Sequence, residues 1–468
     1  MSYIQGESRT QRALFPQSID ELIEQDSAVR VIDAFVSSLD LGELQFERST
    51  PAGTGRPGYD PADLLKLYVY GYLNRVRTSR RLEREAQRNL EVLWLLNRLQ
   101  PDFKTIADFR KNNAEAIVGC CRAFTLFCRQ QGLFAAQLVA IDGSKFQAVA
   151  SRKQVWSKER LQKVSAAIDR KIQEYLQQLD EADSQEPQPS KEDTQGALAA
   201  LQQQKAQLQQ IAQQLTNSGQ SHLVVSEPEA QPMRMAQAKV SPAYNVQSAV
   251  DSEHALIAYF EVTDQASDRE QLFAIAEKAK TELQANALTV LADSGYDNAE
   301  QCARCEQAQI EPVVPAQATV NPRGAQYFHK DEFQYEAEHD RYRCPAGQVL
   351  TRQRTDHTRQ RVLYASTACG GCALRAQCTA SKQRWVQRLI HAEAAERANQ
   401  RAKDNPALMR KRSALVEHPF GGLKYLMRRF VVRGMKKVGA EVALAVTAYN
   451  LKRVLNILGA QAMIRAWT

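Results

Sequence analysis

The sequence predicts an α/β protein in which a helical N-terminal region precedes a core built from strands and helices. At residue 137 the apolar residues change from helical spacing to the short runs and alternation typical of strands. Three strands come first, and helices and strands then alternate, an order that favours an α/β domain. The segments expected in this core are "QLVAID", "AYNVQSAVD", "HALIAYFEVT", the helix "LFAIAEKAKTEL", "LTVLADSGYD", the helix "NAEQCARCEQAQ" and "IEPVVPA".

The N-terminal residues 1–125 are expected to form a separate helical domain. The stretch "DPADLLKLYVYGYLN" has apolar residues at helical spacing, with Asp60 as its cap and Pro61 in its first turn. A further helix is expected in "QPDFKTIADFRKNN", capped near Thr105. Short helices with Arg-rich connections fit a DNA-binding domain of the helix-turn-helix kind, and an ordinary helical bundle fits them equally well.

Two insertions are expected to interrupt the core, which spans residues 137–458. Residues 155–235 are rich in Gln and Ala at helical spacing and are split by the polar stretch "EADSQEPQPSKED", which predicts a helical hairpin with a polar tip. Residues 319–385 contain four of the nine cysteines. Both segments lie between core elements, where insertions are tolerated.

The charge is moderately positive, with 61 Lys and Arg against 53 Asp and Glu and a net charge of +8. The positive residues gather in residues 75–88 and 409–437. Arg predominates in both, which suits bidentate binding of phosphate, although a solvated helix face has a similar composition. No apolar run approaches the roughly 20 residues that span a bilayer, and the chain starts without a secretory signal. We therefore expect a cytoplasmic protein with no membrane partner.

Two aspartates stand in matching positions. Asp142 and Asp293 each follow a strand that reads as buried, each precedes a small residue, and neither has a basic residue nearby in the sequence to hold it in an ion pair. A single Asp at the tip of a strand is usually a turn residue. Two in matching contexts indicate ligands for Mg²⁺ or Mn²⁺, because adjacent strand tips can bring carboxylates together around ions about 3.5–4 Å apart.

A third acid is expected from a helix near the C-terminus. Glu417 has Arg410 and Lys424 seven residues to either side, about two helical turns, so the three share a face if the helix continues through Pro419. A solvated charged face would have the same spacing. Glu441 is a competing acid, but its apolar neighbours indicate a buried, hydrogen-bonded glutamate.

The cysteines are not expected to form a disulfide framework, because their number is odd and no secretory signal is recognised before them. Four of them lie in two segments that contain Gly-rich turns and one C-x2-C pair. Thiols in such turns can form a closed, tetrahedral zinc site, and free thiols are an equal alternative because the spacing is irregular. The four are Cys344, Cys369, Cys372 and Cys378.

Four motifs that occur in order resemble the catalytic core of bacterial insertion-sequence transposases of the DDE type. They are "AIDGSKFQAVAS", "YNVQSAVD", "LADSGYDN" and "VEHPFGGLK", the last followed by "RRFVVRG" and "AYNLKR". The N-terminal "DPADLLKLYVYGYL" and "TIADFRK" are similar to the helical DNA-binding region of the same proteins. The resemblance implies a ribonuclease-H-like mixed sheet flanked by helices, with Asp142, Asp293 and Glu417 as a metal triad.

The resemblance also implies the chemistry and the partners. Two Mg²⁺ or Mn²⁺ ions would serve the cutting of element ends and their joining to target DNA. The partner would be double-stranded DNA, as terminal repeats and as target, and the pairing of two ends implies a homodimer in the synaptic complex. A catalytically inactive or domesticated DNA-binding protein is one alternative, and a metal-dependent nuclease that does not join DNA is another. The presence of all three acids favours an enzyme, and the sequence does not separate cutting from joining.

The resemblance assigns cations to DNA as well. Lys424 would hold a terminal phosphate. In such families the helix motif runs Tyr, two residues, Arg, three residues, Glu, six residues, Lys. Here Arg410 stands at the Tyr position and Ser413 at the Arg position, with Arg412 one place off. The other cations expected at the DNA are Arg77, Arg80, Arg81, Arg410, Arg412, Arg428, Arg429, Arg433, Lys436 and Lys437.

Overall fold

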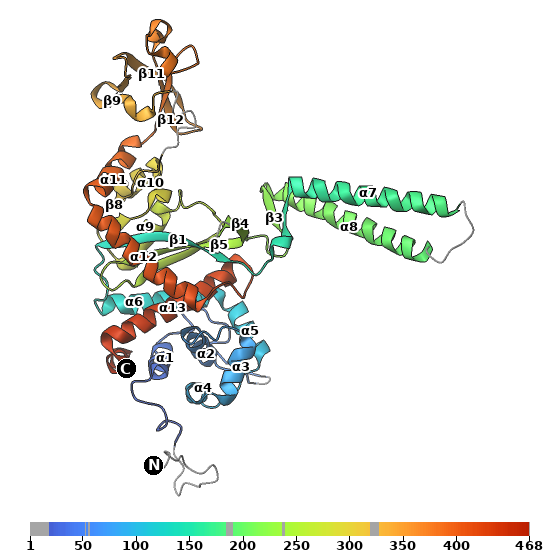
Figure 1. Cartoon of the computed structure of the whole chain (residues 1–468). Coiled ribbons are helices and arrows are strands. Elements are labelled where there is room, and N and C mark those ends of the chain that lie inside the picture. The colour runs from blue at the N-terminus through green and yellow to red at the C-terminus, as the bar shows by residue number, and fades with distance from the viewer. Residues whose placement is uncertain are drawn as a thin grey trace, which may run out of the picture.

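The computed structural model of the chain describes residues 18–467 apart from 52, 55–56, 184–190, 236–238 and 319–326. Its N-terminal part is helical (Figure 1). Asp60 caps the second helix by accepting the Ala62 N–H at 2.8 Å, and Pro61 takes its first position, as predicted. The helices are α1 (Ala28–Ser37), α2 (Pro61–Leu73), α3 (Ser79–Arg88), α4 (Leu90–Leu95), α5 (Phe103–Asn112) and α6 (Ala114–Gln130).

The start of α5 differs from the prediction. The cap is Asp102, whose carboxylate accepts the backbone N–H groups of Lys104 and Thr105 at 2.9 and 3.0 Å. Thr105 is therefore one of the residues that the cap satisfies, and its own hydroxyl donates to Asp102 at 2.7 Å. An aspartate placed just before the first turn can accept the free N–H groups there, so the helix is capped three residues earlier than predicted.

A six-stranded mixed sheet forms the centre of the molecule. Its strand order is β4-β5-β1-β7-β8, and β6 pairs with the part of β5 that β4 leaves free. β1 runs antiparallel to β5 and parallel to β7, which runs parallel to β8. The predicted α/β class, with a mixed sheet flanked by helices, is confirmed. The strands are β1 (Leu138–Gln147), β4 (Gln231–Arg234), β5 (Val240–Asp251), β6 (Ile257–Thr263), β7 (Leu288–Leu291) and β8 (Ile310–Val313).

Helices cover both faces of this sheet. On one face α9 (Leu272–Leu283) and α10 (Ala299–Gln307) pack against alternate side chains of β1, such as Ile141. On the other face α12 (Pro406–Leu426) packs against Ala140 and its neighbours. Because successive side chains of a strand point to opposite faces, Asp142 shares the α12 face with Ala140.

The long helix α13 (Met435–Leu458) joins the sheet to the N-terminal helices. Figure 1 shows it between them, and one continuous apolar core includes residues of α1, α2, α6, α13 and the sheet. Two shorter helices flank this C-terminal part, α11 (Ala392–Asp404) before α12 and α14 (Ala460–Trp467) after α13. The N-terminal helices and the sheet are therefore held together by buried apolar surface.

The prediction that Asp142 ends its strand is wrong. β1 continues to Gln147 and stays paired with β5, with Asp142 opposite Ser248. Only the pairing with β7 stops, at Ala140, because β7 ends at Leu291. Asp142 thus lies where the parallel neighbour ends and the antiparallel neighbour continues.

Two segments extend away from the sheet in Figure 1. The helices α7 (Lys158–Asp183) and α8 (Lys191–Ser218) lie side by side, and the strands β2 (Val155–Ser157) and β3 (His222–Val224) pair at their base. Part of the predicted polar tip, residues 184–190, lies outside the described residues. In the parts of the chain that are described, no helix is long and apolar enough to cross a membrane.

The second segment is a small antiparallel sheet between α10 and α11. Its strand order is β13-β12-β11-β10-β9. The first residues of the predicted Cys-rich insertion, 319–326, are not among those described. The strands are β9 (Gln334–Glu336), β10 (Arg341–Arg343), β11 (Val349–Asp356), β12 (Arg361–Ala365) and β13 (Trp385–Leu389).

Candidate active site

Asp142 and Asp293 converge on one guanidinium group. The Nη2 of Arg412 lies 3.0 Å from Asp142 Oδ2 and 3.5 Å from Asp293 Oδ2. The expectation that neither aspartate has a basic partner is therefore wrong. Arg412 comes from α12, far away in the sequence, so only the packing of α12 on the sheet brings the three side chains together.

The two carboxylates differ in their surroundings. The side chain of Asp142 is 24% exposed and that of Asp293 is 46% exposed. Burial raises the pKa of Asp142 to about 6, although the Arg412 charge beside it acts in the opposite direction. The Oδ1 atom of Asp293 accepts the Gly295 N–H at 2.8 Å, which fixes that side chain at the end of β7. The site thus combines a partly buried carboxyl that holds its proton unusually well with one that is oriented by the backbone.

The surroundings of the pair suit an oxygen-binding cation. Ser248 faces Asp142 across the β1–β5 ladder, and its buried Oγ has no hydrogen-bond partner, as is also true of Arg412 Nε. Buried polar atoms without partners mark places where water or an ion completes the structure. Carboxylate and hydroxyl oxygens are the ligands that Mg²⁺ prefers. Among the residues described, however, no three acidic, thiol or imidazole side chains are gathered closely enough to hold a metal ion.

Glu417 is not brought to the aspartates. α12 continues through Pro419, so Arg410, Glu417 and Lys424 do share a helix face. That face is exposed, and Glu417 lies five residues beyond Arg412, about 140° around the helix. Because Arg412 faces the sheet, Glu417 faces away from it.

Apart from Arg412, the predicted DNA-binding cations fall into three groups. Arg77, Arg81, Arg428 and Arg429 line a groove of about 640 Å³ together with Arg75, which was not among the predicted cations. Arg80 lies outside it, 5.2 Å from the centre of the Phe103 ring. The remaining cations are elsewhere: Arg410, Lys424 and Arg433 are exposed, Lys436 pairs with Glu115 at 2.8 Å, and Lys437 lines a separate hollow near it.

The groove lies at the junction of the N-terminal helices and the sheet. One wall is the start of α3, and the other is the chain that follows α12, where Arg429 bridges to Gln147 at the end of β1. The Arg75 guanidinium lies 4.2 Å from the centre of the Tyr425 ring, which is 63% exposed. Within the described parts of the chain, no carboxylate pairs with the guanidinium groups of Arg75, Arg81, Arg428 or Arg429 at ion-pair distance. Four arginines of the groove therefore carry positive charge that no carboxylate among the described residues pairs with directly.

Arg77 has a different environment. Its Nη1 lies 2.8 Å from Glu441 Oε1 and donates to the carbonyl of Arg429 at 2.9 Å. Glu441 is fully buried, and its second oxygen accepts the Val431 N–H at 2.9 Å. Burial raises the pKa of Glu441, and the nearby guanidinium of Arg110 counters this most strongly. The interpretation of Glu441 as a buried, hydrogen-bonded glutamate is confirmed.

A polar network that the sequence analysis missed lies behind Asp142, on the α9 face of the sheet. Asp268 Oδ1 accepts from Asn245 Nδ2 at 2.7 Å and from Gln247 Nε2 at 2.6 Å, and its Oδ2 lies 3.3 Å from Lys145 Nζ. The buried Tyr296 hydroxyl donates to Gln247 Oε1. The sequence does carry a signal for this network, because Asn245 and Gln247 stand two residues apart in the otherwise apolar "AYNVQSAVD". In a strand that is covered on both faces, buried amide side chains need hydrogen-bond partners.

This network explains the glycine after Asp142. A Cβ atom at Gly143 would overlap Gln247 Nε2 and lie 2.5 Å from Asp268 Oδ1. Gly143 is therefore needed inside a strand, for close approach of side chains, and does not mark a turn.

We expect Gly143→Ala to destabilise the protein by about 1–3 kcal/mol, because the added methyl group must displace hydrogen-bonded amides in a packed site. Urea unfolding followed by circular dichroism measures the change. Gly196→Ala is the control, since open space surrounds that position in the helix α8. Equal stability of the two variants would show that the side chains around Gly143 can move to make room for a methyl group at little cost in free energy.

Comparisons with known proteins agree with one another on the family. Residues 17–112 match the family described as "Transposase domain (DUF772)", and residues 343–455 match the family described as "Transposase DDE domain". These two matches identify a DDE-type transposase. The second match includes Glu417 but neither Asp142 nor Asp293, since both aspartates precede residue 343.

The transposase also resembles one solved structure, the cryo-EM structure of a piggyBac transposase synaptic complex with hairpin DNA. The identity is 9%, the alignment covers 94% of this chain and 79% of that one, and the TM-score is 0.35. A score this low adds nothing to the strand order described above. No curated protein matches the transposase.

Proposed function

We propose that this transposase cuts the ends of its element and joins them to target DNA by metal-dependent phosphoryl transfer. The observation that carries the proposal is the convergence of Asp142 and Asp293 on a single cation, Arg412. Bound here, two Mg²⁺ or Mn²⁺ ions would supply activation of the attacking water or 3′-OH and stabilisation of the leaving oxygen. Asp142 and Asp293 would hold the ions, with Glu417 as the third ligand.

Arg412 is central to how this site would be used. Without ions its guanidinium balances two carboxylates that would otherwise repel each other. With ions held by the two aspartates, Arg412 would be free to bind a DNA phosphate, which a planar guanidinium binds well. The inner face of α12 is packed on the sheet through Leu415 and Val416, so Glu417 could become a ligand only if this helix repacked on the sheet.

The arginine groove is proposed as the track for the DNA backbone. It opens beside Gln147, five residues along β1 from Asp142, which is roughly 17 Å at the rise of a strand. Phosphates in the groove would then lie about five base pairs from the phosphate that is cut, at about 3.4 Å per base pair. The exposed Tyr425 and the stacked Arg75 add a flat surface that can contact a sugar or an unpaired base.

We expect Arg81→Gln and Arg428→Gln each to weaken DNA binding at all sequences, because a phosphate contact carries no sequence information. Each loss should reduce the slope of log affinity against log salt by about 0.9. Fluorescence anisotropy at a series of salt concentrations measures both quantities. Arg170→Gln, an equal charge change on the exposed surface of the hairpin helix α7, is the matched control. An unchanged slope in both groove variants would contradict the proposed track.

The experiment that tests the function supplies the wild-type protein with Mg²⁺, labelled DNA carrying the element's terminal repeats, and a supercoiled target plasmid. A transposase cuts the ends and transfers them to the plasmid. Cut ends without transfer would indicate a nuclease, and binding without cutting would indicate an inactive or domesticated protein. The proposed place of action is the cytoplasm, and the proposed active form is a homodimer, which light scattering of the complex with two DNA ends would measure.

A further inference from the structure

The small antiparallel sheet has little apolar surface of its own. Its buried core consists of five residues, and Figure 1 shows it at the far end of the molecule from the N-terminal helices. A segment of roughly 60 residues buries a small share of its surface and is only marginally stable, so a metal or a disulfide often supports such a fold. The core residues are Phe333, Tyr342, Leu350, Tyr364 and Val386.

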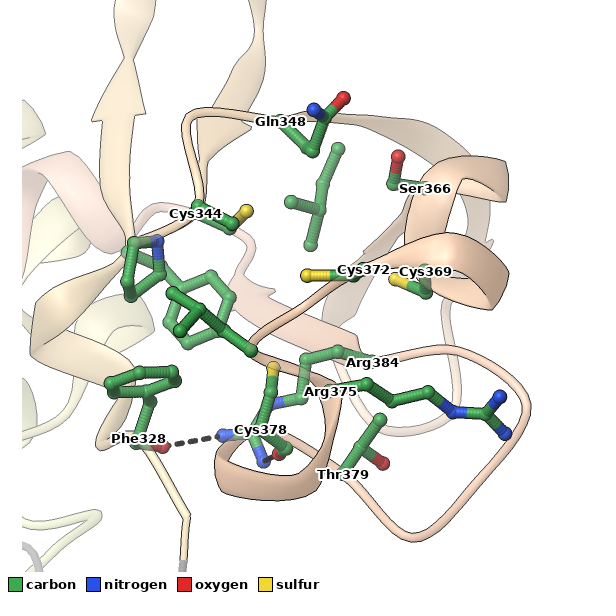
Figure 2. A pocket seen from close by; sticks show the side chains of 15 residues that line it. Phe328, Cys344, Gln348, Ser366, Cys369, Cys372, Arg375, Cys378, Thr379 and Arg384 are labelled. Carbon is green, nitrogen blue, oxygen red and sulfur yellow. Dashed lines mark hydrogen bonds between the residues drawn. The ribbon is translucent and has the colours of Figure 1, made fainter.

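Four cysteines from separate turns line one cavity beside this core. Cys344 follows β10, Cys369 and Cys372 lie in the connection after β12, and Cys378 follows a short helical turn further on. Figure 2 shows their side chains around the same hollow. The cavity has a volume of about 20 Å³, enough for one water-sized sphere and hence for one ion.

The turns that carry these cysteines are tight and are held by the backbone. The Cys344 N–H donates to the Gln348 carbonyl at 2.9 Å, and the Gly347 N–H donates to the Cys344 carbonyl at 2.8 Å, with a φ of +76° at Gly347. The Cys372 carbonyl accepts the Arg375 N–H at 3.1 Å in the same way. These backbone hydrogen bonds fix the positions of Cys344 and Cys372 at the cavity.

The chemistry of the cavity selects the kind of ion. All four cysteines are free thiols, and the lining includes no carboxylate and no imidazole among the described residues. Sulfur ligands favour zinc over Mg²⁺ or Ca²⁺, and four of them complete a tetrahedral site with no open position.

Arg384 supplies a second, independent observation. Its Nη1 and Nη2 donate to the carbonyls of Cys378 and Phe328 at 3.2 and 3.1 Å, while its buried Nε has no hydrogen-bond partner. A zinc ion with four thiolates carries a net negative charge that a cation at the wall would balance. A thiolate is also an acceptor that could satisfy the orphaned Nε.

We propose that Cys344, Cys369, Cys372 and Cys378 bind one structural zinc ion that stabilises the small sheet. The sulfur atoms are not gathered around a common point in the described structure. A cysteine needs to change only one side-chain torsion between staggered positions to swing its sulfur inward. The site is independent of the carboxylates, and it serves folding rather than the chemistry on DNA.

The test measures zinc in the full-length protein after dialysis against EDTA, by mass spectrometry of the metal. Wild type and Cys305→Ala, which removes a buried thiol of α10, should each retain about one zinc per chain. Cys372→Ser and Cys344→Ser should retain less than about a tenth of it, and Asp142→Asn should retain all of it. Zinc that is retained by Cys372→Ser and Cys344→Ser, or that is lost from Asp142→Asn, would overturn the proposal.

A second measurement does not depend on variants that fold. Native wild-type protein is titrated with a mercurial reagent while a chromogenic dye reports released zinc. Release should be complete when about four thiols have reacted, and the thermal unfolding temperature should fall with it. Wild-type protein that holds no zinc after refolding in its presence would also refute the site.

Discussion

Replacing Asp142 or Asp293 with asparagine is expected to reduce Mg²⁺-dependent cutting of element ends by roughly a thousandfold or more, because metal ions supply several kcal/mol of stabilisation to the transition state. An asparagine at either position would keep the shape of the side chain but remove the charge that attracts the ions. DNA binding should stay within about twofold, since neither aspartate lines the arginine groove. A gel assay with end-labelled DNA and an anisotropy assay measure the two quantities on the same preparations.

The same assays decide the role of Glu417. If it is the third ligand, Glu417→Gln loses activity to a similar degree, even though the side chain faces away from the aspartates in the described structure. Glu300→Ala, which removes an exposed acid at the start of α10, is the control and should remain active. Retained cutting by Glu417→Gln would rule out its role as a ligand while leaving the aspartate pair in place.

Arg77→Met is expected to destabilise the protein by about 3–5 kcal/mol, the cost typical of leaving a buried charge without its partner. Glu441 is fully buried and Arg77 donates to it at 2.8 Å, so the substitution removes its ion-pair partner. The carboxylate keeps the Val431 N–H and the charge of Arg110 nearby. Guanidinium or urea unfolding followed by circular dichroism gives the free energy of unfolding.

The double variant Arg77→Met with Glu441→Leu separates this effect from a loss of packing. Removing both charges should recover much of the lost stability, so the two substitutions should be strongly non-additive. If the double variant is destabilised by the sum of the single changes, the pair is not coupled. Arg77 would then be free to act on DNA, as the sequence analysis expected.

The presence of the core strands and the cap of α2 could be predicted from local sequence. Asp60 and Pro61 began α2 as predicted because a cap acts on neighbouring backbone groups. The aspartates could be paired in advance because parallel strands place their ends at one edge. The length of β1 beyond Asp142 could not be predicted, because the partner that extends it, β5, lies about a hundred residues away.

The sequence by itself determined the α/β class, the matching positions of Asp142 and Asp293 and the turns that carry the cysteines, since these depend on periodicity, residue type and short spacing. Only the tertiary structure decided their partners. In it Arg412 lies between the aspartates, Glu417 lies on the outer face of the same helix, and Arg77 forms an ion pair with Glu441. It also placed Asp268 against Gly143. These contacts depend on how α12, α13 and a distant loop pack on the sheet, and burial rather than local spacing fixes which charged groups must meet.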